Sequence, residues 1–212
     1  MRWRQLTIAG ALLAGMLAPP PAHAGANDGV ERALRAASVL VGSGCSGVLA
    51  EGPDLVLTAE HCIPGRQSVE LRFSDGATRT GWVVAIDHVA DQALVLLEQP
   101  VALTPLMIVR NLPVGGTVLY FEGRPSEPRF QEAKLEKVGR CPSLPALPNA
   151  LFTTIAGVPG DSGAAIVDAG ARVVGLVHGG AQCQIATPAD TLLRLVDHFF
   201  ASDEIQLPAP PG

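Results

Sequence analysis

Aromatic and lysine residues are scarce in this chain. Aromatic residues make up 4% of the 212 residues, and the lysines are Lys134 and Lys137. Acidic residues outnumber basic ones by 20 to 15. Proteins that bind nucleic acid ordinarily need a basic groove for the phosphates or aromatic side chains on which bases stack. We therefore expect no nucleic-acid partner.

Long apolar runs are also lacking, except for one at the amino terminus. Arg2 and Arg4 precede the apolar residues 6–17, and Ala22-His23-Ala24 has the small-x-small pattern of a cleavage site. A run of about 12 residues is shorter than the roughly 20 that a membrane-spanning helix requires. Residues 1–24 are therefore predicted to be a cleaved signal peptide and not a membrane anchor. We expect the mature protein to be secreted or periplasmic, with no membrane association after cleavage.

Cysteine is limited to four residues, Cys45, Cys62, Cys141 and Cys183. In the oxidising compartment that a signal peptide implies, such cysteines can pair, and four of them allow three connectivities. A bridge from Cys45 to Cys62 would close a loop of 62 minus 45, or 17, residues and stabilise the fold by about 3 kcal/mol. No spacing of histidine and cysteine suggests a metal site, so we expect no metal and no cofactor.

Glycine and proline are abundant by comparison, with 23 and 18 residues, and divide the chain into short segments. Short apolar or β-branched runs between turn residues are typical of β-strands. In the first half we expect strands at 38–41, 46–49, 55–57, 68–73, 81–86 and 93–97. Six short strands in about 60 residues predict a small closed sheet or sandwich.

A proline- and glycine-rich connector over 100–116 leads to a second set of runs. Strands are expected at 117–122, 129–138, 150–154, 164–167, 173–177 and 184–187. After Pro188 apolar residues recur at a helical period, which predicts a helix. The expected organisation is a lead-in at 25–37 that is a short helix or a mobile segment, β domains at 38–112 and 113–188, a helix at 189–201 and a disordered tail at 202–212.

The strongest local motif is Gly160-Asp161-Ser162-Gly163. Glycines on both sides let the backbone turn tightly around Ser162, which leaves its hydroxyl exposed and lets the N–H groups of Gly160 and Ser162 converge on one point. Two convergent donors form an oxyanion hole. Because a serine hydroxyl is a weak nucleophile at neutral pH, the motif requires a histidine base and an orienting acid elsewhere in the chain.

One histidine and two candidate acids meet this requirement. His61 follows an apolar strand, where a lone histidine is more often structural, but the adjacent Cys62 would hold it rigidly through a bridge to Cys45. Asp91 lies at the entrance to the apolar run that begins at residue 93. Asp87 competes for the same role, and we favour Asp91 because that apolar strand starts two residues after it.

In the order His61, Asp91, Ser162, the chain resembles the trypsin-like (chymotrypsin-family) serine proteases, in a compact bacterial-type form. The matching blocks are 45–49 with 57–62, 91–94, and 160–163 with 174–180. The resemblance implies an all-β fold of two six-stranded antiparallel β-barrels with a C-terminal α-helix. It also implies a serine endopeptidase with a polypeptide substrate, which we expect to be a monomer.

The resemblance further implies a role for individual residues. Ser162 is the implied nucleophile, His61 the general base and then acid, and Asp91 its orienting acid. The N–H groups of Gly160 and Ser162 are the implied oxyanion hole. Further implied features are an edge that pairs with the substrate backbone at Gly179-Gly180 and, because Val158 stands where relatives often carry cysteine, a bridge from Cys141 to Cys183.

Specificity and activation leave alternatives open. Ala156, six residues before Ser162, is expected at the floor of the S1 pocket, where no acidic residue would select Lys or Arg. His178 is expected beside the pocket wall, either selecting an acidic side chain or standing next to a pocket for small apolar ones. No Ile-Val-Gly-Gly start is present. The Asp161 carboxylate is therefore expected to pair either with a group inside the protein or with a new amino terminus released by a cut after Arg32 or Arg35.

Two readings from other functional classes compete with the enzyme. A catalytically silent protein of the same fold would bind a partner, but such proteins commonly lack one member of the triad. A disulfide-bonded β domain that binds carbohydrate or protein and has no catalytic activity would leave the glycine-flanked Ser162 and the His61 turn unexplained.

Overall fold

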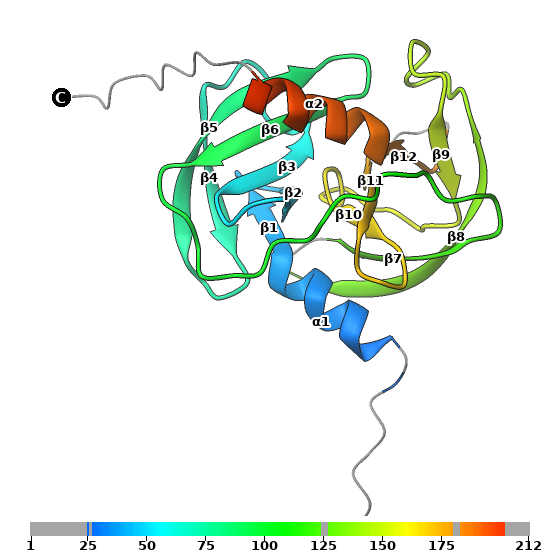
Figure 1. Cartoon of the computed structure of the whole chain (residues 1–212), viewed down its shortest axis with the longest axis horizontal. Coiled ribbons are helices and arrows are strands. Elements are labelled where there is room, and N and C mark those ends of the chain that lie inside the picture. The colour runs from blue at the N-terminus through cyan, green and yellow to red at the C-terminus, as the bar shows by residue number, and fades with distance from the viewer. Residues whose placement is uncertain (1–24, 26, 124–126, 180–182, 202–212) are drawn as a thin grey trace, which may run out of the picture.

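The computed structural model describes residues 25, 27–123, 127–179 and 183–201 (Figure 1). Two closed six-stranded antiparallel β-barrels form its body, and a helix follows the second barrel. This confirms the predicted fold class. The predicted signal peptide at 1–24 and the predicted tail at 202–212 lie outside the described residues.

The first barrel has the strand order β1-β2-β3-β6-β5-β4. Val69, Leu71 and Phe73 alternate with exposed residues and face the barrel core, as expected for a strand with one solvated side. The strands β3 and β6 are buried almost throughout. The bounds are β1 (Ser38–Val41), β2 (Cys45–Leu49), β3 (Leu55–Ala59), β4 (Ser68–Phe73), β5 (Thr78–Asp87) and β6 (Gln92–Leu97).

The second barrel has the order β10-β11-β12-β9-β8-β7. A disulfide between Cys141 and Cys183 joins the loop after β8 to the segment before β12, which confirms the expected pairing. The bounds are β7 (Val118–Gly123), β8 (Arg129–Gly139), β9 (Ala150–Thr153), β10 (Ala165–Val167), β11 (Val173–Val177) and β12 (Ile185–Pro188).

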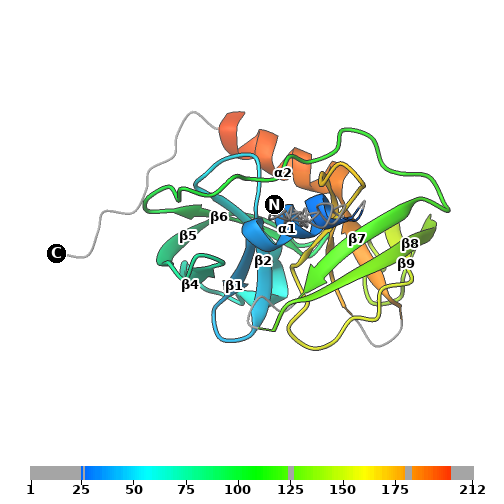
Figure 2. The same ribbon diagram turned by 90° about the horizontal axis from the view of Figure 1, so that it is seen from below.

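Two helices link the halves of the molecule. The lead-in is a helix, α1 (Asp28–Ala37), which packs against β7 (Figure 2). Its Arg35 pairs with the buried Glu122 at 3.1 Å. The helix α2 (Ala189–Ala201) leaves the second barrel and returns across β5 and β6 of the first (Figure 1). In the described part of the chain, no helix has the length and apolar character needed to cross a membrane.

Strand ends differ from the predicted ones by a few residues, and one difference matters for the site. The predicted strand 55–57 continues to Ala59, because Thr58 and Ala59 pair with Ala93 and Gln92 of β6. This extra pairing carries the chain that follows β3 directly to the residue before β6, which is Asp91.

Candidate active site

The strand pairing of the first barrel brings His61 beside Asp91. A short 3₁₀ helix, η1 (Glu60–Cys62), follows β3, and its first N–H donates to the carbonyl of Asp91 at 3.2 Å. Asp91 has a left-handed backbone with φ of 52°, a conformation that aspartate adopts more readily than most residues. Two residues that are 30 positions apart in the sequence are therefore adjacent at the end of one ladder.

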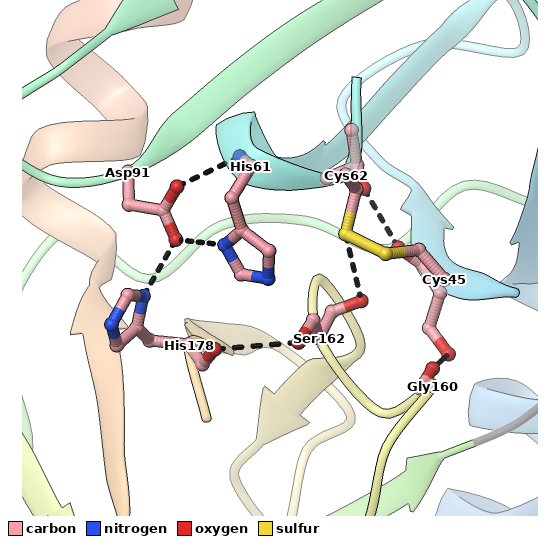
Figure 3. Close-up of a disulfide and its surroundings, with 9 residues drawn as sticks. Cys45, His61, Cys62, Asp91, Gly160, Ser162 and His178 are labelled. Carbon is pink, nitrogen blue, oxygen red and sulfur yellow. Dashed lines mark hydrogen bonds and ion pairs between the residues drawn. A yellow bond between two sulfur atoms is a disulfide. The ribbon is translucent and has the colours of Figure 1, made fainter. Parts of the chain in front are cut away.

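The Asp91 carboxylate accepts three hydrogen bonds (Figure 3). Its Oδ1 accepts from the backbone N–H of His61 at 2.9 Å, and its Oδ2 lies 2.7 Å from Nδ1 of His61 and 2.6 Å from Nδ1 of His178. Burial would raise the pKa of Asp91, but the hydrogen bonds from His178 and His61 outweigh burial and lower it to about 2. The carboxylate is therefore ionised at neutral pH and holds an Nδ1 proton on the His61 ring.

Asp87, the competing acid, has a different place. Its Oδ1 accepts from the N–H groups of Val89 and Ala90 at 2.9 and 3.0 Å, in the turn between β5 and β6. These are contacts of a turn aspartate. Of the two acids, the structure brings Asp91 to His61.

His61 is held from two sides and its side chain is 45% exposed. The disulfide from Cys45 to Cys62 ties η1 to β2, as expected from the sequence. The hydrogen bond with Asp91 raises the pKa of His61 against the opposing effect of burial, and the charges of Asp91 and Glu60 add to the increase. The ring is thus a stronger base than an isolated imidazole.

The loop that carries Ser162 docks onto the first barrel. Gly160 and Gly163 have φ of 99° and 84°, which glycine tolerates without strain. The N–H of Ser46 on β2 donates to the carbonyl of Ser162 at 2.9 Å, and the Ser46 hydroxyl donates to the carbonyl of Gly160 at 2.7 Å. A Cβ at position 163 would overlap the carbonyl oxygen of Ser46, so this approach requires glycine.

The Ser162 hydroxyl lies between the two barrels. It donates to the carbonyl of His178 at 3.4 Å, and the outer nitrogen of the His61 ring points toward the Ser162 side of the site (Figure 3). Among the described residues, the N–H groups of Gly160 and Ser162 have no hydrogen-bond acceptor. Both amides are therefore free to bind an oxyanion.

A cavity of about 370 Å³ opens beside Ser162. Its lining includes Gly179, but neither Ala156 nor the His178 side chain. Gly180 lies outside the described residues. The walls are largely apolar and come from Ile155, Val158, Pro159, Val177 and Ile185.

Asp161 has an internal partner that the sequence did not indicate. Its Oδ2 accepts from the Arg129 guanidinium at 2.6 Å and from the N–H of Val158 at 2.8 Å, and the residue is buried. Arg129 begins β8, and a single arginine at a strand start carries no sequence signal for such a role. Of the two alternatives for Asp161, the structure shows the internal one.

A nitrogen or oxygen atom of each of His61, Asp91 and His178 lies within 4.8 Å of the others, so these three residues are candidates to hold a metal ion. Zinc binds nitrogen at about 2.0–2.1 Å and oxygen at about 2.0–2.2 Å. The two Nδ1 atoms lie 2.7 and 2.6 Å from one carboxylate oxygen, which is hydrogen-bond spacing. A second cluster contains Cys45 and Cys62, whose sulfurs are consumed in a disulfide.

Comparison with known proteins places these residues in a family. A model of the trypsin-like peptidase domain matches residues 45–176, which include the positions of His61, Asp91 and Ser162. No curated protein is significantly similar to the chain in sequence.

Solved structures share the fold at low identity. An inactive serine-to-alanine mutant of Rv3671c from M. tuberculosis is 19% identical with a TM-score of 0.68, over 88% of this chain and 97% of that one. Deg5 is 21% identical with a TM-score of 0.67, over 82% and 93%. A serine endoprotease from Yersinia pestis is 18% identical with a TM-score of 0.69, over 83% and 67%.

Identities this low support the two-barrel fold and no finer property. The match to the family model supports membership of the family. It spans more than half of the chain and contains the paired histidine and aspartate and the glycine-flanked serine described above. On these grounds the chain belongs to the trypsin-like peptidase family.

Proposed function

We propose that this protein is a serine endopeptidase that works through a triad of Ser162, His61 and Asp91. The observation that carries the proposal is the 2.7 Å contact between Asp91 Oδ2 and His61 Nδ1, in a ring whose outer nitrogen points toward the Ser162 side of the site (Figure 3). A buried carboxylate at this place fixes the tautomer in which the outer ring nitrogen can accept a proton.

The proposed reaction follows from these positions. The outer nitrogen of His61 takes the Ser162 proton as Oγ attacks the substrate carbonyl carbon, and Asp91 stabilises the imidazolium. The N–H groups of Gly160 and Ser162 donate to the oxyanion of the tetrahedral intermediate. His61 then gives its proton to the leaving amine, and water releases the acyl group from Ser162 by the reverse roles.

The cavity beside Ser162 supports a preference for an apolar P1 side chain. The carboxylate that borders the cavity, Asp161, is bound to Arg129 and so is not offered to a substrate lysine or arginine. The His178 ring is turned to Asp91, which leaves no histidine cation on the described wall to select glutamate. Profiling cleavage sites on a mixed peptide library should give Ala, Val or Leu at P1, whereas a preference for Glu would contradict this assignment.

The two disulfides fit an oxidising compartment, the periplasm or the cell exterior. Export is proposed to depend on the predicted signal peptide at 1–24. Fractionation of producing cells, with the amino-terminal sequence of the exported protein, tests both points.

The pH dependence of hydrolysis tests the role of His61. Because its pKa is raised, the base form is expected to appear only above the ordinary value of about 6.5, so kcat/KM should rise with a midpoint above 6.5. At pH 6 the activity should be less than about one quarter of the plateau. Glu60→Gln removes a negative charge that raises the pKa of His61 and should lower the midpoint. If kcat/KM of the wild type rises with a midpoint at or below pH 6, His61 is not the base.

Because Arg129 pairs with Asp161 in the uncut chain, activity is proposed to need no amino-terminal cleavage. Arg129→Ala removes the guanidinium that lies 2.6 Å from the buried Asp161 carboxylate, and breaking a buried ion pair typically costs about 3–5 kcal/mol. The Ser162 loop should lose order and activity together. Arg172→Ala is the matched control, because the Arg172 side chain is exposed and an ion pair screened by water, such as the one with Asp168, contributes little to stability.

The measurements are urea unfolding and kcat/KM on protein whose α1 is uncut. Full activity that appears only after cleavage at Arg32 or Arg35 would contradict the internal role of Arg129.

A further inference from the structure

His178 joins the candidate acid to the opposite barrel. The residue follows β11, and its Nδ1 lies 2.6 Å from the same Asp91 oxygen that His61 contacts at 2.7 Å. The two rings meet edge to face with centroids 5.6 Å apart. The His178 side chain is 13% exposed, compared with 45% for His61, so only one of the two imidazoles is open to a substrate.

The backbone of His178 fixes where its ring can lie. Its N–H donates to the carbonyl of Ile185 at 3.1 Å, and its own carbonyl accepts the Ser162 hydroxyl at 3.4 Å. The preceding carbonyl, of Val177, accepts the N–H of Gly163 at 2.8 Å. One residue therefore contacts the acid through its ring and the nucleophile through its main chain.

A second contact between the barrels lies next to the first. Gln92 follows Asp91 and is fully buried, and its amide donates to the Thr187 hydroxyl at 2.9 Å and to the carbonyl of Pro188 at 3.2 Å. The backbone at Asp91 is thus held without help from His178. What the His178 ring adds is a third donor to the carboxylate itself, and it is the largest of the contributions that keep the pKa of Asp91 low.

We propose that His178 is a positioning residue for Asp91, which donates its Nδ1–H to hold the carboxylate toward His61, and that it does not select the substrate. The proposal rests on the proposed function of the triad. It replaces the expectation that this histidine stands on the S1 wall.

Substitutions at His178 separate a positioning role from a structural one. His178→Phe keeps a ring but removes the donor, and His178→Asn places an amide N–H near the position of Nδ1. Because a hydrogen bond to a charged group contributes about 1.5–3 kcal/mol, kcat should fall about 10- to 100-fold in the phenylalanine variant. In the asparagine variant kcat should return to within about 3-fold of wild type. KM and the P1 profile should stay unchanged in both, and His198→Phe on α2 is the matched control.

A second measurement does not depend on enzyme activity. The titration of the Asp91 carboxyl is followed by ¹³C NMR in a Ser162→Ala background. The carboxyl should titrate at higher pH with His178→Phe and near its wild-type pH with His178→Asn. If the phenylalanine variant does not fold, His178→Gln serves in its place, because its amide lies near Nε2 and cannot replace the lost donor. An inactive wild type would refute the proposed function, while this titration would still test His178.

Three results would overturn the proposal. They are a folded His178→Phe variant with wild-type kcat, an Asp91 titration that does not respond, and a P1 preference that changes when the ring is replaced. The last result would return His178 to the substrate pocket.

Discussion

Replacing Ser162 with alanine is expected to lower kcat about 10⁶-fold without disturbing the fold, as loss of the nucleophile does in other serine proteases. Among the described residues, the hydroxyl hydrogen-bonds to the carbonyl of His178 alone, at 3.4 Å, so its removal costs little stability. The carbonyl of residue 162 still accepts a hydrogen bond from the N–H of Ser46, so the loop stays bound to the first barrel.

Ser74→Ala is the matched control for this measurement, because Ser74 is an exposed serine whose hydroxyl donates to the carbonyl of Ala36. The control should keep wild-type kcat. Hydrolysis of a peptide substrate with apolar P1 is followed for both variants, with thermal unfolding as a check on folding. Ser162→Ala protein that retains more than about 1% of wild-type kcat would rule out Ser162 as the nucleophile.

Replacing Asp91 with asparagine is expected to lower kcat about 10⁴-fold. The amide has the shape of the carboxyl, but an N–H facing Nδ1 of His61 favours the tautomer whose outer nitrogen carries the proton and cannot accept another. The variant also loses an acceptor that now binds two histidine Nδ1 atoms, so some loss of stability is expected alongside.

Asp87→Asn separates this effect from a general effect of acids in the β5–β6 turn. An asparagine oxygen can still accept from the N–H groups of Val89 and Ala90, so the Asp87 variant should stay within a few-fold of wild type. If the Asp87 variant loses about 10⁴-fold and the Asp91 variant does not, the assignment of the acid is wrong.

The fold can be predicted from the sequence because each strand is indicated by a short local pattern of residues. Apolar runs between glycine and proline turns marked all twelve strands, and the sequence places Cys62 next to His61. The sequence offers the bridge from Cys45 to Cys62 as one of three connectivities, which is attractive because it would hold His61 rigidly, whereas the bridge from Cys141 to Cys183 comes only with the family resemblance. The sequence leaves open whether the lead-in is a helix, since a helix of ten residues is too short to be stable alone and depends on packing against β7.

The contacts that were missed are all between distant segments. Asp91 and His178 are 87 residues apart, and the family resemblance predicts His178 beside the pocket wall and not beside Asp91. Arg129 and Asp161 likewise meet only after two strands of the second barrel are paired. Counting six residues back from Ser162 predicts Ala156 at the pocket floor, but the path of the loop leaves Ala156 exposed and outside the cavity lining.

The most direct test of Ser162 as the nucleophile is labelling of the folded, disulfide-intact protein with a fluorophosphonate, followed by mass spectrometry to locate the adduct. We expect a single adduct on Ser162 in wild type, and none in Ser162→Ala or His61→Ala. An adduct on another residue, or none on wild-type protein, would contradict this expectation, and the absence of any adduct would favour a protein of this family that binds a partner without cleaving it.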